Sequence, residues 1–260
     1  ELSLSGIFST SVGPAMEIQN IGGLLVLNQT VSELVNIIIS DSFFNVTPFL
    51  ATDDNISFTN FQIKNNEIAL YDNGFLACWN TYTMLFNITF EKNTILAYEN
   101  ERRILALEIF SLHTSNLTFL GSSFSDLSMT IENTFFINLP STGQESYLHM
   151  ADVRFRNMTF DIREFIFVQL ASEYVSVTNI TFDTIITLDS TTIIFGGFST
   201  RVTLKKSSIV NCTGEITVIA YDLAVDELLF RANHISPRIS RGAINGQSLI
   251  VTNSLFIENE

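Results

Sequence analysis

The stretch Val175-Ser-Val-Thr-Asn-Ile-Thr-Phe-Asp183 decides the fold of this chain. Apolar and polar residues alternate from Val175 to Thr178, which is the period of a strand with one buried face. Phe182 follows the second apolar residue, Val177, by five positions. Because side chains in a strand alternate between two faces, residues at an odd offset share a face only if the chain bends between them. The stretch therefore predicts a strand, a tight corner at Asn179 and a second short strand.

The same pair of residues recurs along the chain. When Val177 is taken as an anchor, the residue five positions later is Phe or Ile in all ten matches. The pairs are Ile39 and Phe44, Phe58 and Ile63, Phe90 and Ile95, Phe119 and Phe124, Ile131 and Phe136, Phe155 and Phe160, Val177 and Phe182, Leu204 and Ile209, Phe230 and Ile235, and Val251 and Phe256. A strand and corner repeated at intervals of about twenty to thirty residues indicate a solenoid.

Small or amide residues fill the expected corners: Asn60, Gly121, Asn133, Asn157, Asn179 and Asn253. Asparagine tolerates the left-handed backbone conformation and bonds to its own backbone, so it suits a tight corner. Successive coils stack at the usual strand spacing of about 4.8 Å, which buries their apolar faces. We therefore expect an interior ladder of Phe and Ile and a corner ladder of Asn.

This pattern resembles the right-handed parallel β-helix, or pectin-lyase-like, superfamily over roughly residues 16 to 260. The resemblance implies an all-β, right-handed parallel β-helix solenoid of about ten or eleven coils. It also implies one domain over residues 1–260, which is either complete or a segment of a longer chain. The long interval from Phe58 to Phe90 suggests a protruding loop. Because many unrelated functions share this fold, the resemblance fixes no function.

Composition excludes several classes of partner. The net charge is −14 with only 13 Lys and Arg, which opposes binding to nucleic acid and to anionic membranes. It also opposes binding to polyanionic pectin unless Ca²⁺ mediates. No run approaches the roughly eighteen apolar residues of a membrane span, so none is expected. The chain starts at Glu1 without a signal peptide, which indicates a mature protein or a fragment.

The two cysteines, Cys78 and Cys212, are expected to remain unbridged within the chain. About five coils separate them, which is roughly 24 Å at the strand spacing. A disulfide tolerates Cα atoms at most about 7 Å apart. Cys212 is then a free thiol near a corner, and an intermolecular bridge is the alternative.

The strongest surface motif is the N-glycosylation acceptor Asn-x-Ser/Thr. It occurs at Asn28, Asn45, Asn55, Asn87, Asn116, Asn157, Asn179 and Asn211. Asn55, Asn87 and Asn116 each lie three residues before an anchor, where an outward edge is expected. N-linked glycans are therefore expected, with no other cofactor. The alternative is a corner Asn followed by an outward Thr, without any sugar.

Catalytic signatures are weak. Polygalacturonase-like members of the superfamily use clustered aspartates with Gly-His-Gly and Arg-x-Lys motifs, and this chain has neither motif. The adjacent pair Asp53 and Asp54 is the only such candidate, and inverting hydrolysis needs two carboxylates about 6.5–9.5 Å apart. The histidines His113, His149 and His234 have no metal-binding spacing. No metal site is expected.

The leading functional hypothesis is a secreted or cell-surface structural glycoprotein that forms a rod. Neither end shows a capping helix, so either the chain is a segment of a longer one or other copies cover its ends. In the second case the rods assemble end to end as homo-oligomers or filaments. One alternative is a carbohydrate-active enzyme, a polysaccharide lyase or hydrolase, that uses Asp53 and Asp54. The other is an adhesin that contacts polysaccharide along one flat face through exposed aromatic residues.

Overall fold

In the computed structural model of the chain, the described residues are 2–3, 16–19, 25–26, 33–44, 49–51, 55–70, 76–97, 107–130, 134–139, 147–161, 164–170, 174–195, 201–235 and 244–259. All regular secondary structure in these residues is β-strand. No helix among them is long and apolar enough to cross a membrane. The predicted corner at Asn133 and the anchor Ile131 lie outside this part of the chain.

The strands fall into three groups. The first group carries the segments that lead into a first corner: β4 (Glu33–Ser40), β7 (Asn55–Lys64), β9 (Leu76–Glu91), β11 (Leu107–Leu120), β14 (Tyr147–Ala151), β17 (Tyr174–Thr178), β19 (Arg201–Lys205), β21 (Thr213–Asp226) and β24 (Ile244–Thr252). The second group continues around the coil: β5 (Phe43–Phe44), β8 (Glu67–Leu70), β10 (Thr94–Ala97), β12 (Ser123–Thr130), β15 (Arg154–Asp161), β18 (Thr181–Phe195), β20 (Ser208–Val210), β22 (Leu229–Arg231), β23 (His234–Ile235) and β25 (Leu255–Ile257). β2 (Met16–Gln19) belongs to the second group, because it pairs with the part of β4 that follows Asn36. The remaining strands are β1 (Leu2–Ser3), β3 (Leu25–Val26), β6 (Phe49–Ala51), β13 (Thr134–Leu139) and β16 (Glu164–Leu170).

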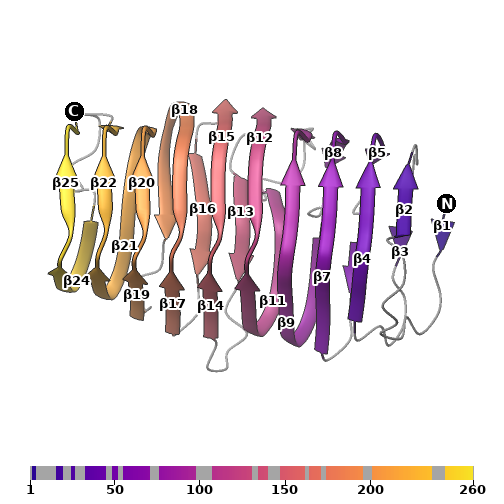
Figure 1. Ribbon diagram of the computed structural model, residues 1–260, viewed down its shortest axis with the longest axis horizontal. Coiled ribbons are helices and arrows are strands. Elements are labelled where there is room, and N and C mark those ends of the chain that lie inside the picture. The colour runs from indigo at the N-terminus through magenta and orange to yellow at the C-terminus, as the bar shows by residue number, and fades with distance from the viewer. Residues whose placement is uncertain are drawn as a thin grey trace, which may run out of the picture.

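Parallel pairing stacks these strands along one axis (Figure 1). We call the segments before the first corner the first face. On this face, residues 174–178 pair with 147–151 on one side and with 201–205 on the other. Similar pairings continue in both directions, from Glu33 on β4 to Thr252 on β24. The predicted all-β parallel solenoid is thus confirmed, and the two termini lie at opposite ends of the long axis.

Each coil turns twice through left-handed residues. The first corner is formed by Asn36, Asn60, Asn87, Gly121, Asp152, Asn179, Lys206, Glu227 and Asn253, whose φ angles lie between 49° and 58°. The second corner follows five residues later at Asp41, Asn65, Lys92, Asn157, Thr184, Asn211, Ala232 and Glu258, with φ between 49° and 57°. Backbone hydrogen bonds cross the rungs here as well, for example from the Asn179 amide to the Lys205 carbonyl at 2.9 Å. The corners therefore preserve the parallel register instead of interrupting it.

The two corners explain the five-residue repeat and correct one interpretation of it. Val177 and Phe182 flank the first corner, whereas Phe155 and Phe160 flank the second. The interval from Phe58 to Phe90 joins a first-corner anchor to the second-corner anchor of the next coil. The interval is one coil plus one five-residue step, so it is not itself evidence of a protruding loop.

A continuous apolar column runs between the two corners. Its members pair rung by rung and are all Phe or Ile: Ile18, Ile39, Ile63, Phe90, Phe124, Phe155, Phe182, Ile209, Phe230 and Phe256. The Phe155 ring stacks on Phe124 and Phe182 at centroid distances of 5.1 and 4.9 Å. The predicted interior ladder of Phe and Ile is therefore present.

A ladder of buried amides lies just after the second corner. The Asn66 side-chain oxygen accepts the Ser42 backbone N–H at 3.0 Å, and the Asn93 oxygen accepts the Asn66 backbone N–H at 3.0 Å. Asn233 repeats this arrangement by accepting the Cys212 backbone N–H at 2.9 Å. Buried backbone groups need such partners, so these amides complete the hydrogen bonding of the corner.

Cys212 is a buried free cysteine directly after the second-corner residue Asn211. Its predicted state as a free thiol near a corner is confirmed. Burial raises the pKa of the Cys212 thiol to about 11. A protonated, buried thiol is a poor nucleophile, which opposes the alternative of an intermolecular bridge.

Candidate functional site

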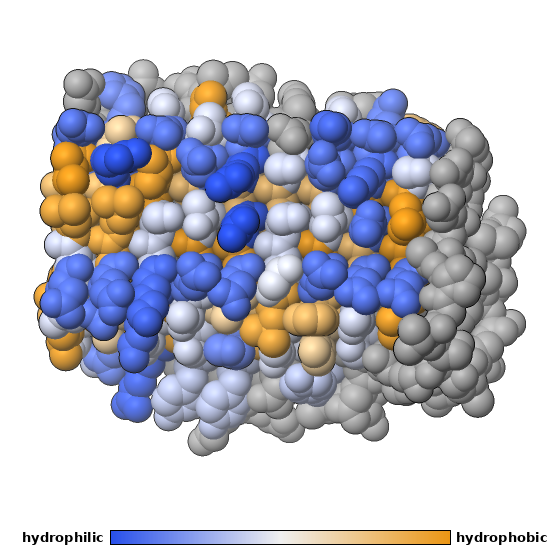
Figure 2. Space-filling model, viewed as in Figure 1, coloured by the Kyte–Doolittle hydropathy of each residue, from blue (hydrophilic) through white to orange (hydrophobic). Residues whose placement is uncertain are grey.

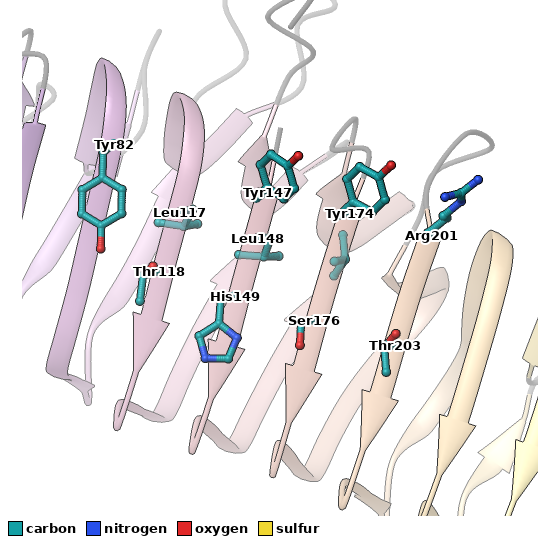
Figure 3. A pocket seen from close by; sticks show the side chains of 11 residues that line it. Tyr82, Leu117, Thr118, Tyr147, Leu148, His149, Tyr174, Ser176, Arg201 and Thr203 are labelled. Atoms are coloured by element: carbon teal, nitrogen blue, oxygen red, sulfur yellow. The ribbon is translucent and has the colours of Figure 1, made fainter. Parts of the chain in front are cut away.

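A groove with a volume of about 520 Å³ lies on the outer surface of the first face. It crosses β9, β11, β14, β17 and β19 and therefore runs along the axis of the solenoid (Figure 3). Two rows of side chains line it, and each row takes one residue from successive coils. Strand alternation sets this arrangement, because residues on either side of a buried position face outward.

The first row is mainly aromatic. Tyr147 and Tyr174 are register partners, and their rings stack with centroids 5.2 Å apart and an interplanar angle of 10°. The Arg201 guanidinium lies 5.7 Å from the centre of the Tyr174 ring. Arg201 is in turn held by Asp222, with Nε 3.2 Å from the carboxylate oxygen. Tyr82 lines the same groove two rungs beyond Tyr147. The row is thus fixed by contacts between neighbouring coils.

The second row is polar and carries Thr118, His149, Ser176 and Thr203, which pair in this order along the axis. Leu148 and Val175 lie between the two rows, and their side chains are buried in the core. Hydroxyl groups donate and accept hydrogen bonds, so this row can bond to many polar partners. The groove therefore has one aromatic wall and one hydrogen-bonding wall.

Four of the predicted glycosylation asparagines lie at exposed left-handed corners. Asn87 and Asn179 belong to the first corner, and Asn157 and Asn211 belong to the second. The Asn87 amide donates to the Asn60 side-chain oxygen at 2.7 Å, and the Asn179 amide donates to Asp152 at 2.6 Å. A glycosylated amide nitrogen keeps one N–H, so a sugar there is compatible with these bonds.

The other sequons are placed differently. Asn55 and Asn116 lie on the first face, where each pairs in register with Tyr82 and Asn116 also pairs with Tyr147. Asn87, in contrast, is an exposed corner residue, which agrees with the outward edge predicted for it. Asn28 and Asn45 lie outside the described residues.

Asp53 and Asp54 lie outside the described residues. Among the residues that the structure does describe, no group of three or more His, Cys, Asp or Glu side chains could hold a metal ion. Asp226 is an acidic residue with a clear role at the first corner. Hydrogen bonds from Thr252 and Asn253 lower the pKa of its carboxyl group and tie one rung to the next.

The C-terminal rung carries an exposed apolar surface. Exposed large apolar side chains on β24 and β25 are Leu249, Ile250, Val251, Leu255 and Phe256. Figure 2 shows hydrophobic side chains gathered at this end and hydrophilic ones in bands along the axis. Phe256 belongs to the interior column and contacts Phe230 at a centroid distance of 5.6 Å. Leu249, Val251 and Phe256 continue the interior positions of the solenoid, whereas Ile250 and Leu255 face outward by their register.

Sequence reasoning did not find the groove, although a signal was present. Tyr82, Tyr147, Tyr174 and Arg201 each lie three residues before a buried position that precedes a first corner. This is the position recognised for Asn55 and Asn116. Coil lengths vary here, with register offsets of 27, 31 and 34 residues, so the tyrosines fall at irregular intervals in the sequence.

No family model matches the chain, and comparisons with curated proteins and with solved structures find no match either.

Proposed function

We propose that this protein is a rod-like structural glycoprotein that works outside the cell or on the cell surface. The proposal rests chiefly on one observation: Asn87, Asn157, Asn179 and Asn211 all lie at exposed corners of a regular solenoid. Each is the acceptor of an Asn-x-Ser/Thr sequon, which is modified in the secretory pathway. The stacked phenylalanines and the buried amide ladder support the further proposal of a pectin-lyase-like relationship.

Mapping of glycans tests this proposal. The chain would be expressed in a eukaryotic secretory host, and occupied asparagines would be identified by mass spectrometry after enzymatic removal of the sugars. We expect occupancy at the four corner sequons. Each substitution, such as Asn179→Gln, should remove one glycan from the total mass.

Asn60→Gln is the matched control, because Asn60 is a half-buried corner residue that is followed by Phe61 and Gln62 and forms no sequon. It should leave the glycan mass unchanged. Secretion of a chain with all four corner asparagines unmodified would contradict the proposal.

The second part of the proposal is that copies of the chain assemble end to end. Among the described residues, β25 pairs with β22 alone, and the rung formed by β24 and β25 exposes apolar side chains. A further rung from a second copy would cover this surface and continue the ladder. Electron microscopy of the purified protein should show fibres several rods long. Fibres should be lost in Val251→Lys, which places a charge at an interior position of the exposed rung. Single rods in the unaltered protein would refute this part.

A further inference from the structure

We propose that the groove on the first face binds a neutral oligosaccharide chain, which lies along the axis of the solenoid. This inference goes beyond the structural role proposed above. It concerns the groove surface, whereas the structural role rests on the corner sequons.

The two walls of the groove match the two sides of a sugar ring. A pyranose has C–H groups on its faces and hydroxyl groups around its edge. Tyr147 and Tyr174 offer a fixed aromatic wall, which favours the apolar face. Thr118, Ser176 and Thr203 offer hydroxyls on the opposite wall, which can bond to the edge. Pockets of roughly 300–1,000 Å³ that combine aromatic lining with a few polar groups are typical ligand sites, and this groove has about 520 Å³.

The repeat of the groove favours a chain over a compact ligand. Successive rungs are about 4.8 Å apart, and each presents one residue of each row. His149, Ser176 and Thr203 are successive register partners, so similar polar groups recur along the axis. A linear saccharide presents similar hydroxyl groups at regular intervals and can bond to several rungs at once.

The charges favour a neutral saccharide. Among the described residues, no side chain that lines the groove is a carboxylate, and Arg201 is already paired with Asp222 at 3.2 Å. The chain as a whole carries a net charge of −14, which repels polyanions. An acidic saccharide in this groove would therefore find no unpaired arginine with which to form an ion pair, and the net negative charge of the chain would repel it.

Isothermal titration calorimetry on the full chain tests this inference. The protein would be produced in bacteria without N-glycans, because the sequons Asn55 and Asn116 pair in register with Tyr82 of the aromatic row. The neutral probes are cellohexaose and chitohexaose, and the acidic probe is hexagalacturonate. We expect at least one neutral probe to bind at least tenfold more tightly than hexagalacturonate.

Four variants locate the binding. Tyr147→Ala and Tyr174→Ala should each weaken the affinity at least tenfold. Ser176→Gln should do the same by filling the groove while leaving both tyrosines in place. Tyr221→Ala is the matched control, since Tyr221 is 46% exposed and does not line the groove, and its affinity should stay within twofold. Circular dichroism and thermal melts confirm that each variant is folded.

Three results would overturn the inference. They are an absence of binding to both neutral probes, tighter binding of hexagalacturonate than of either neutral probe, or an equal loss of affinity in Tyr221→Ala. None of them bears on the corner glycans, so failure here is distinguishable from failure of the structural proposal.

Discussion

At the scale of single residues, the fold depends on left-handed backbone at two positions in each of eight described coils. This conformation costs roughly 1–2 kcal/mol for a residue with a Cβ and less for Asn or Gly. The corners at Asn60, Gly121 and Asn179 were predictable because Asn and Gly adopt the left-handed conformation more readily than other residues. The corners at Lys206 and Glu227 were not predictable from residue type. Backbone hydrogen bonds to the neighbouring rung hold the left-handed conformation there, whichever residue occupies the corner.

Opposite substitutions at two corners should change stability in opposite directions. Ala232 has φ of 52°, so Ala232→Asn should stabilise the fold by roughly 0.5–1 kcal/mol. Gly121 has φ of 58°, and a Cβ added there would meet only the Phe86 ring at 3.7 Å. Gly121→Ala should therefore destabilise by about 1 kcal/mol through backbone strain alone. Urea unfolding measures both changes, and a loss of stability in Ala232→Asn would contradict the account.

The buried amide ladder should be sensitive to truncation. Asn233 accepts the Cys212 N–H at 2.9 Å and donates to the Ile209 carbonyl at 3.0 Å. Asn233→Ala leaves both groups buried without these partners, which should cost roughly 2–4 kcal/mol. The control is Asn253→Ala at the exposed first corner, which should cost about 1 kcal/mol or less. Chemical unfolding of the two variants would refute this interpretation if their losses were equal.

Because Cys212 is buried, we expect the folded protein to lose stability at alkaline pH. The folded thiol has a pKa of about 11 against an ordinary value of 9.0, so at a pH between these values the thiol ionises only in the unfolded chain. The stabilisation is complete below pH 9 and is lost as the pH rises towards 11, by roughly 2–3 kcal/mol in total. Urea unfolding at pH 8, 9 and 10 should show this decline, and Cys212→Ala should flatten it. Identical pH profiles would show that the thiol does not contribute.

At the scale of elements, the anchor pairs were predictable because a column of like residues repeats regardless of coil length. Val177 and Phe182 keep their five-residue offset since strand, corner and strand form one rigid unit. The existence of a second corner was not foreseen. The residues that flank the second corner are five positions apart, like those that flank the first, so the two corners look alike in the sequence. The groove was missed for a related reason. Outward side chains such as Tyr147 and Tyr174 become neighbours only through the register between coils, and coil length varies.

The phenylalanine column should dominate the stability of its rungs. Phe155 is 0% exposed and stacks on two rings, so Phe155→Ala should destabilise the fold by about 3–5 kcal/mol. Phe86 is 39% exposed, and Phe86→Ala serves as a control that should cost about 1 kcal/mol or less. Thermal or urea unfolding compares them. Similar losses in both variants would mean that Phe155 does not lie in a close-packed column.

At the scale of the whole molecule, each coil contacts mainly its neighbours, so the structure is a one-dimensional stack (Figure 1). The central claim is that successive coils superimpose in one register. Thr178 pairs with Lys205 across two coils, and both side chains are accessible outside the apolar column. Parallel partners lie about 4.8 Å apart, whereas a shift of two residues places Cα atoms about 8 Å apart.

Disulfide cross-linking tests this register directly. In a chain with Cys78→Ala and Cys212→Ala, the pair Thr178→Cys and Lys205→Cys should close a disulfide under mild oxidation, because Cα atoms about 4.4–6.8 Å apart can be bridged. The pair Ser176→Cys and Lys205→Cys, which is displaced by two residues, should remain reduced, as mass spectrometry of the oxidised peptides would show. Closure of the displaced pair, with the register pair left reduced, would contradict the superimposed coils.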